Sequence, residues 1–271
     1  MLVLLPPSEG KAQAASGPPV DLPGLSLPGL TAARETVLAE LVALCSSDPD
    51  KAREVLGLGE RLRDEVTRNA ALLTAPARPA GEIYTGVLYD ALGLATLSPE
   101  GRERAGRSLL VFSALWGAVR VTDPIPAYRL SGGTKLPGIG PLGAFWRPAL
   151  GEVMPGAVRE AAGSGDGGLV LDLRSTAYAG MWKPAGEVAS RIATVRVLHS
   201  RTVDGVERRS VVSHFNKATK GRLVRDLLEA GTRPGTPEEL AEELRALGYR
   251  VEEGPERPGR ARQLDVVVSE L

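Results

Sequence analysis

The chain has 271 residues, enough for one large domain or two modest ones with a substantial hydrophobic core. Hydrophobic residues make up 43% and charged residues 24%, a balance typical of folded proteins, which excludes a wholly disordered chain. Lysine and arginine together number 33, as do aspartate and glutamate, so a nucleic acid partner would have to bind at a local basic patch.

Cysteine and histidine are scarce. Cys45 is the single cysteine, which excludes an intramolecular disulfide, and with two histidines a conventional Cys/His zinc site is excluded as well. We therefore predict no metal and no cofactor. No run of about 18 apolar residues is present, and residues 1–5 are too few for the apolar part of a signal peptide. We expect a cytoplasmic protein that does not contact membranes.

The first predicted elements are a strand, a loop and a helix. Residues 1–5 form a continuous apolar run that stops at Pro6, which is typical of a strand buried on both faces. Residues 12–30 are rich in proline, glycine and serine and are predicted to be a loop. Thr31 then offers a helix N-cap, and apolar residues follow it at helical spacing.

A helical subregion is expected at about residues 31–75, and a helix-hairpin-helix-like insertion within it near 48–73. Asp48 caps a short helix, which ends at Gly57-Leu-Gly59. A third helix is predicted to carry on one face Leu62, Val66 and Leu73. Gly57 and Gly59 would let the turn approach a phosphate, which main-chain amides would bind. The alternative is an ordinary helical hairpin, since the insertion holds six acids and five bases.

The rest of the chain alternates strands and helices without a strict βαβ period. Strands are predicted at 109–112, 169–173, 195–201, 208–213, 249–251 and 264–268, and helices after Ser98, over about 216–230 and after Thr236. The strands on either side of Asp204 are expected to pair as a hairpin. We predict a mixed α/β fold in which a mixed β-sheet is flanked by helices, forming one domain over residues 1–271.

Two short segments match the letters of known nucleotide-binding and catalytic motifs but lack the structural context that those motifs require. Gly138–Gly143 spells GxGxxG but follows a loop instead of a buried strand. Ser8–Lys11 spells SxxK, but Pro6 and Pro7 argue against the helical turn that would bring the two side chains together. What remains is a polar loop at the end of a buried strand, which either holds a ligand or is simply solvated.

Polar side chains also follow other predicted strands and begin a predicted helix. If these strands are neighbours, the side chains form one positively charged cleft suited to a phosphate group. The alternative is a set of structural ion pairs. The predicted cleft comprises Ser8, Lys11, Ser113, Arg120, Arg129, Ser175, Tyr178, Lys217, Lys220 and Arg222.

Several of these residues lie in blocks that resemble the YaaA family of peroxide-stress proteins. The blocks are Leu4-Leu-Pro-Pro-Ser-Glu-Gly-Lys11, Tyr84-Thr-Gly86, Ser113-x-Leu-Trp-Gly-x-x-Arg120-x-x-Asp123, Pro126-Ala-Tyr-Arg-Leu130, Phe145-Trp146, Leu173-Arg-Ser-x-x-Tyr178 and Lys217-x-x-Lys220-Gly221. The resemblance implies a cytoplasmic bacterial protein that binds DNA, carries a helix-hairpin-helix and lowers intracellular iron under oxidative stress.

Two functions follow from these observations. In the first, a stress protein binds duplex or junction DNA with weak sequence specificity through its basic side chains and the amides of Gly57 and Gly59. In the second, an enzyme acts on a small anionic or nucleotide-like ligand in the same cleft. Non-specific DNA binding does not need phenols or a carboxylate at fixed positions, whereas proton transfer does. The catalytic candidates are Lys11, Tyr84, Asp123 and Tyr128.

Overall fold

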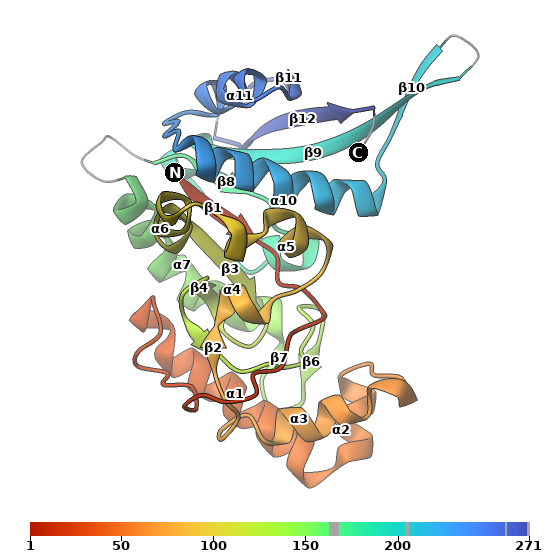
Figure 1. The fold of residues 1–271 in the computed structure, drawn as a ribbon. Helices are drawn as coiled ribbons and strands as arrows, with labels where there is room; N and C mark the ends of the chain where they lie inside the picture. The colour runs from red at the N-terminus through yellow and green to blue at the C-terminus, as the bar shows by residue number, and fades with distance from the viewer. Residues whose placement is uncertain (163–167, 204–205, 258, 270–271) are drawn as a thin grey trace.

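Eight strands form one mixed β-sheet in the computed structural model (Figure 1). The structure describes residues 1–162, 168–203, 206–257 and 259–269. The strand order is β11-β12-β9-β8-β1-β3-β4, with β10 pairing to β9 beside this path. The strands are β1 (Leu2–Leu5), β3 (Leu109–Ser113), β4 (Gly117–Arg120), β8 (Val170–Asp172), β9 (Ile192–Val203), β10 (Val206–Ser210), β11 (Arg250–Glu253) and β12 (Arg262–Val268).

The centre of the sheet is parallel and buried. Strand β1 pairs in parallel with β3 on one side and β8 on the other, so that Leu4 lies opposite both Leu110 and Asp172. All four residues of β1 are 0–1% exposed, which explains their continuous apolar sequence. Because these strands run in one direction, the loops that follow them begin at the same edge of the sheet. Strand β4 instead pairs antiparallel with β3 and returns toward the opposite edge.

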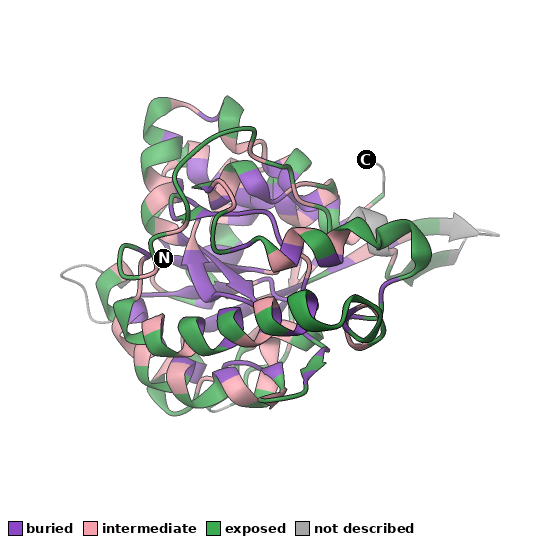
Figure 2. Cartoon of the chain, turned by 90° about the horizontal axis from the view of Figure 1, so that it is seen from below, coloured by how far each residue is buried: buried purple, intermediate pink, exposed green. Residues whose placement is uncertain are grey.

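Helices surround the sheet, and their outer sides are exposed whereas the strands at the centre are buried (Figure 2). Helix α10 packs on α5 and on β9, and α7 contacts β1 and β4. The helices are α1 (Thr31–Ser47), α2 (Pro49–Val55), α3 (Asp64–Ala70), α4 (Ala80–Ile83), α5 (Val87–Leu92), α6 (Pro99–Ser108), α7 (Leu142–Ala162), α8 (Thr176–Ala179), α9 (Glu187–Ser190), α10 (Ser213–Ala230) and α11 (Pro237–Ala246). The mixed α/β prediction is confirmed.

Short elements complete the fold. Strands β2 (Arg78–Pro79) and β5 (Pro124–Ile125) form a two-stranded sheet, as do β6 (Lys135–Leu136) and β7 (Gly140–Pro141). Single 3-10 turns precede α1, α3 and α6 in the chain: η1 (Pro28–Leu30), η2 (Glu60–Leu62) and η3 (Leu94–Thr96). No helix in the described part of the chain combines the length and apolar character needed to cross a bilayer.

Three predicted helix caps are confirmed and one is wrong. Asp48, Ser98 and Thr236 each accept a hydrogen bond from the backbone amide three residues later, as N-caps do. Thr31 is instead the first residue of α1, and Leu30 occupies the N-cap position because η1 leads directly into the helix.

The predicted face of the third helix is wrong in part. Val66 is buried, but Leu62 and Leu73 are 36% and 58% exposed. Leu62 lies in the 3-10 turn η2, which has three residues per turn and therefore shifts the phase of the apolar pattern. Helix α3 ends at Ala70, so Leu73 is outside it.

Two elements differ from expectation, one in existence and one in length. The sequence pattern did not predict α7, which contains Pro148 and Pro155 and buries Trp146. Strand β9 runs further than its apolar residues suggest. Its start pairs with β8, and its end pairs antiparallel with β10 in an arm that extends from the body (Figure 1). The predicted turn at Asp204 lies outside the described residues.

Candidate functional site

A lysine and two buried tyrosines meet beyond the carboxyl ends of β1 and β3. Lys11 forms an isolated antiparallel bridge with Tyr84, which lies just after α4. Its Nζ atom lies 4.3 Å from the ring centre of Tyr128 and 5.6 Å from that of Tyr84. Both tyrosines are 2% exposed, whereas Lys11 is half-buried above them. Together with Ser8 and Ser113, these three residues are called the Lys11 cluster below.

The loop after β1 folds back on itself to place the amine. The Ser8 hydroxyl donates to the Gly10 carbonyl at 2.6 Å and accepts from the Thr85 amide at 3.0 Å. The Lys11 ammonium donates to the Ser8 carbonyl at 2.7 Å. These bonds connect the loop to the segment that follows α4. They hold the amine over the phenol rings without the helical turn that the SxxK motif requires.

Beneath the amine, three hydroxyl groups form a chain. Ser113 Oγ accepts from the backbone amides of Leu115 at 3.2 Å and Trp116 at 3.0 Å. It also lies 2.6 Å from the Tyr128 hydroxyl, which in turn lies 3.0 Å from the Tyr84 hydroxyl. The chain begins at the turn between β3 and β4, in the fully buried interior, and ends at Tyr84, the residue that forms the bridge with Lys11.

Burial controls the protonation of this site. It lowers the pKa of Lys11 to about 7, assisted by Arg129 and opposed by Glu65 and Glu9. Burial also raises the pKa of Tyr84 and of Tyr128 well above the usual tyrosine value. At neutral pH the site therefore holds two protonated phenols and an amine that exchanges its proton readily, a combination suited to proton transfer.

Arg129 borders the site, and both its guanidinium group and its backbone are hydrogen-bonded. Its guanidinium donates to the Glu9 carboxylate at 2.7 Å and to the Glu9 carbonyl at 3.2 Å. Asn69 of α3 donates to the Arg129 carbonyl at 2.7 Å and accepts from its amide at 2.9 Å. Our sequence predictions omitted Asn69 and Glu9. The signal for Asn69 was its position three residues after Val66, on the buried face of a helix.

Tyr178 of α8 interacts electrostatically with Arg129. Its hydroxyl accepts from the Gly132 amide at 3.1 Å. Burial raises its pKa to about 12, the Gly132 amide and Arg129 lower it, and Glu9 raises it. A Cβ at position 132 would lie 3.0 Å from the Tyr178 ring, which explains the glycine there. Ser175 is exposed immediately before α8.

Arg120 and Asp123 are not brought to the Lys11 cluster. In the β3–β4 pairing, Ser113 lies opposite Gly117 but Arg120 lies opposite Leu110, nearer the other end of β3. Arg120 there donates to the Arg107 carbonyl and pairs with Glu160 at 3.3 Å. The antiparallel return of β4 explains this separation, because it reverses the direction in which the chain leaves Ser113.

The Asp123 carboxylate is occupied by structural hydrogen bonds. It accepts from the Ser26 amide at 3.1 Å, the Ser26 hydroxyl at 2.7 Å and the Arg120 amide at 2.9 Å. Its side chain therefore ties the loop before α1 to the turn after β4. This contact gives it a structural role that its position in the polar segment 113–129 did not reveal.

Helix α10 distributes its three basic candidates differently. Burial lowers the pKa of Lys220, and Asp172 at the end of β8 opposes that shift, which places Lys220 toward the strand ends. Lys217 is exposed one turn earlier on the same side of the helix. Arg222 is exposed near Tyr249, whose pKa it lowers, and a spacing of two residues places it away from Lys220.

Only one of the two glycines in the turn between α2 and α3 adopts a backbone conformation that favours glycine. Gly57 has a φ of +64° and donates its amide to the Glu54 carbonyl at 3.0 Å, an interaction that ends α2. Gly59 has φ −70° and ψ 166°, and among the described residues no acceptor contacts its amide. Two of the flanking arginines are paired with acids, Arg53 with Glu60 and Arg63 with Asp50.

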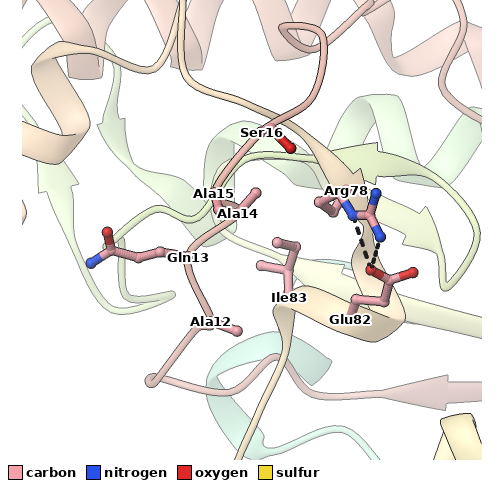
Figure 3. A pocket seen from close by; sticks show the side chains of 8 residues that line it. All are labelled: Ala12, Gln13, Ala14, Ala15, Ser16, Arg78, Glu82 and Ile83. Atoms are coloured by element: carbon pink, nitrogen blue, oxygen red, sulfur yellow. Dashed lines mark hydrogen bonds and ion pairs between the residues drawn. The ribbon is translucent and has the colours of Figure 1, made fainter.

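A pocket of about 320 Å³ lies between the same two segments that carry Lys11 and Tyr84 (Figure 3). One wall continues from Lys11 over residues 12–16, and the other comprises Arg78, Glu82 and Ile83. The Ala12 amide donates to the Ile83 carbonyl at 2.9 Å, so the walls are joined beside the bridge at Lys11. No group of three or more His, Cys, Asp or Glu residues able to hold a metal ion occurs within the described ranges.

Comparisons with known proteins point to one family. A family profile described as peroxide stress protein YaaA matches residues 1–254. A UPF0246 protein of Streptomyces coelicolor is 65% identical over 272 residues, which cover 100% of both chains. UPF0246 proteins of Corynebacterium efficiens and Corynebacterium glutamicum are 42% and 44% identical, covering 99% and 94% of this chain and 100% and 96% of their own.

Proposed function

Because the chain belongs to the YaaA family of peroxide stress proteins, we propose that it acts in the cytoplasmic response to peroxide by binding DNA. The observation that carries this proposal is the convergence of Lys11 and Arg129, from distant parts of the sequence, at one edge of the sheet. Lys220 of α10 interacts electrostatically with Asp172, the last residue of β8. Cationic groups gathered in this way are suited to the phosphates of a DNA strand.

Two further elements supply phosphate contacts in this proposal. Lys217 and Lys220 contact the backbone from α10, and the Gly59 amide contacts it from the turn between α2 and α3. Such contacts bind the backbone and not the bases, so duplex or junction DNA would be bound with weak sequence specificity. Bound protein would limit DNA damage, and we include in the proposal that its action lowers intracellular iron, as the family resemblance implies.

Salt dependence tests the DNA proposal. Binding to a fluorescently labelled duplex should weaken steeply as salt rises, because each phosphate contact releases a counterion. A Lys217→Ala, Lys220→Ala double variant should bind more weakly, with a slope of log K against log salt reduced by about 0.9 for each phosphate that is no longer neutralised. A matched control is Arg107→Ala with Arg233→Ala, which removes two exposed positive charges elsewhere on the molecule. A wild-type affinity that is independent of salt would exclude the DNA proposal.

A second function is favoured by the Lys11 cluster itself. A lysine with a pKa of about 7 above two protonated phenols is more than backbone binding needs, and it matches an enzyme that acts on a small anionic or nucleotide-like substrate. In this alternative, Lys11 exchanges a proton with the substrate while Arg129 binds its anionic group.

Thermal unfolding with added nucleotides tests this alternative. A substrate should raise the Tm of the wild type and fail to raise that of Arg129→Ala. Glu103→Ala, which removes an exposed charge from an i,i+4 pair on α6, serves as the control. If no member of a nucleotide panel raises the wild-type Tm, the enzymatic alternative loses its support.

A further inference from the structure

The direction of the hydroxyl chain can be worked out from its buried end. A serine hydroxyl has one hydrogen and two acceptor positions. Both acceptor positions of Ser113 are used by the amides of Leu115 and Trp116. Ser113 must therefore donate its single hydrogen to Tyr128, the remaining partner at 2.6 Å. The turn after β3 thus fixes the direction of the first bond.

The three hydroxyl groups carry one hydrogen more than the hydrogen bonds between them use. The hydroxyls of Ser113, Tyr128 and Tyr84 carry three hydrogens, but only two hydrogen bonds join them. A head-to-tail chain, in which each bond polarises the next, has Tyr128 donating to Tyr84. Apart from an electrostatic contact with Ser113, the hydrogen of Tyr84 then has no acceptor among the described residues, although the side chain is 2% exposed. A neighbouring phenol behaves differently: Tyr89 donates to the Pro6 carbonyl at 2.7 Å.

The tyrosine that carries the surplus hydrogen lies next to groups that attract an anion. Lys11 Nζ uses the carbonyls of Ser8, at 2.7 Å, and Glu9, at 3.4 Å, which leaves its third hydrogen available. Tyr178 accepts from the Gly132 amide and likewise has no acceptor for its own hydrogen in the described part of the chain. Arg129 donates at 3.2 Å to the same Glu9 carbonyl that Lys11 contacts, so the two cationic groups lie close together. The site thus combines two neighbouring cations with phenol hydrogens that no acceptor in the described part of the chain uses.

We infer that Ser113, Tyr128 and Tyr84 form a directed hydrogen-bond relay that presents the Tyr84 hydroxyl to a phosphate oxygen of the ligand. This inference rests on the proposed function, since it names the group recognised at the same site. A phosphate has several oxygens that accept hydrogen bonds and carries the negative charge that Lys11 and Arg129 attract. The phosphate belongs either to a small nucleotide or to a DNA strand, and the two sources can be separated experimentally.

Removing a single oxygen tests the relay. Tyr84→Phe should weaken the binding of inorganic phosphate and of adenosine monophosphate, measured by calorimetry, by about 10- to 100-fold, because the variant cannot donate a hydrogen bond to the charged group. Tyr89→Phe is the matched control, since Tyr89 is also buried and stacks on Tyr84 at 5.4 Å but donates its hydrogen to the protein. Its affinity should stay within about twofold of the wild type. Equal affinities of Tyr84→Phe and wild type would overturn the inference.

A measurement on the wild type covers the case in which Tyr84→Phe does not fold. Adding inorganic phosphate should change the tyrosine doublet in the ultraviolet resonance Raman spectrum toward that of a strongly donating phenol, in the wild type and in Tyr89→Phe alike. An unchanged doublet at saturating phosphate would also overturn the inference.

Binding of a labelled duplex identifies the source of the phosphate. If Tyr84→Phe loses adenosine monophosphate but keeps DNA, the relay serves a small nucleotide; if it loses both, the relay contacts the DNA backbone. Both results support the relay. Wild-type protein that binds DNA but neither phosphate nor adenosine monophosphate overturns the relay and leaves the DNA proposal intact. The reverse pattern supports the relay and rejects DNA as the ligand.

Discussion

The Lys11 cluster and the surroundings of Asp123 are both buried polar networks, but they use their hydrogen bonds differently. Asp123 accepts three hydrogen bonds, two from Ser26 and one from the Arg120 amide, so both of its carboxylate oxygens are engaged within the protein. The Lys11 cluster instead holds one more hydroxyl hydrogen than its own acceptors use. The first network joins parts of the chain, and the second retains a donor for something else.

This difference separates residues that sequence reasoning had treated as equals. Asp123 and Tyr128 lie five residues apart in one polar segment, and both were catalytic candidates. When every donor and acceptor of a buried network is paired within the protein, removing one group lowers the free energy of unfolding. A network with a spare donor should lose ligand binding when cut, with a smaller loss of stability. Substitutions in the two networks can therefore confirm or break the distinction.

The largest effect on stability is expected from Asp123→Ala. The change leaves the Ser26 amide, the Ser26 hydroxyl and the Arg120 amide without their acceptor in a site that is 5% exposed. It also removes the negative charge that opposes the burial of Arg34, whose pKa is lowered to about 10. We expect the free energy of unfolding in urea to fall by about 3–5 kcal/mol.

Glu103→Ala is the control for this loss, since the exposed pair of Glu103 with Arg107 should contribute under about 1 kcal/mol. If the free energy of unfolding falls by the same small amount in both variants, the carboxylate of Asp123 does not stabilise the fold. Asp123 would then be a catalytic candidate again.

A smaller loss is expected from Asn69→Ala, on the other side of the comparison. Asn69 is fully buried and satisfies both the amide and the carbonyl of Arg129. Its removal should cost about 2–3 kcal/mol in urea denaturation and should also weaken ligand binding, because Arg129 loses its backbone support. Loss of stability without loss of binding would show that the position of Arg129 does not depend on this contact.

Much of the fold could be predicted because local signals agreed with it. Residues 2–5 are apolar on both faces because β1 lies between β3 and β8, and Asp48, Ser98 and Thr236 are capping residues in sequence and in structure. Helix α7 was missed because proline at 148 and 155 indicates a helix end. There, the tertiary packing that buries Trp146 outweighs local propensity.

The site could be predicted only where parallel strands dictate a common edge. Ser8 and Lys11 follow β1, and Ser113 is the last residue of β3. The structure brings these residues together with Tyr84 and Tyr128. Arg120 was wrongly assigned to the cleft because the sequence does not indicate that β4 runs antiparallel to β3. The contact of Asn69 with Arg129 spans 60 residues and leaves no local pattern.

The pH dependence of stability should report the Lys11 amine. Its pKa is about 7 in the folded protein against 10.5 for an ordinary lysine, so the unfolded state binds more protons between these pH values. Wild-type stability should therefore rise with pH across this window relative to Lys11→Met, by at most about 1.4 kcal/mol per pH unit. Below pH 7 the difference should be constant. Urea denaturation of both proteins at each pH cancels the titrations that they share, and a flat difference from pH 7 to 10 would contradict the burial of the amine.

The smallest effects on stability are expected in the turn between α2 and α3. Its two glycines differ in backbone conformation, since Gly57 has a positive φ and Gly59 does not. Gly57→Ala should cost about 1 kcal/mol, because position 57 has a positive φ although no atom lies within 4 Å of an added Cβ. Position 59 has an ordinary extended conformation and the same open surroundings, so Gly59→Ala should leave the free energy of unfolding unchanged or raise it by about 0.5 kcal/mol. If the Gly59 amide contacts a DNA phosphate, that methyl group should still obstruct the approach and weaken duplex binding. A Gly59→Ala protein with unchanged stability and unchanged DNA affinity would remove this turn from the DNA-binding surface and leave α10 and the Lys11 cluster as the elements that bind the phosphates.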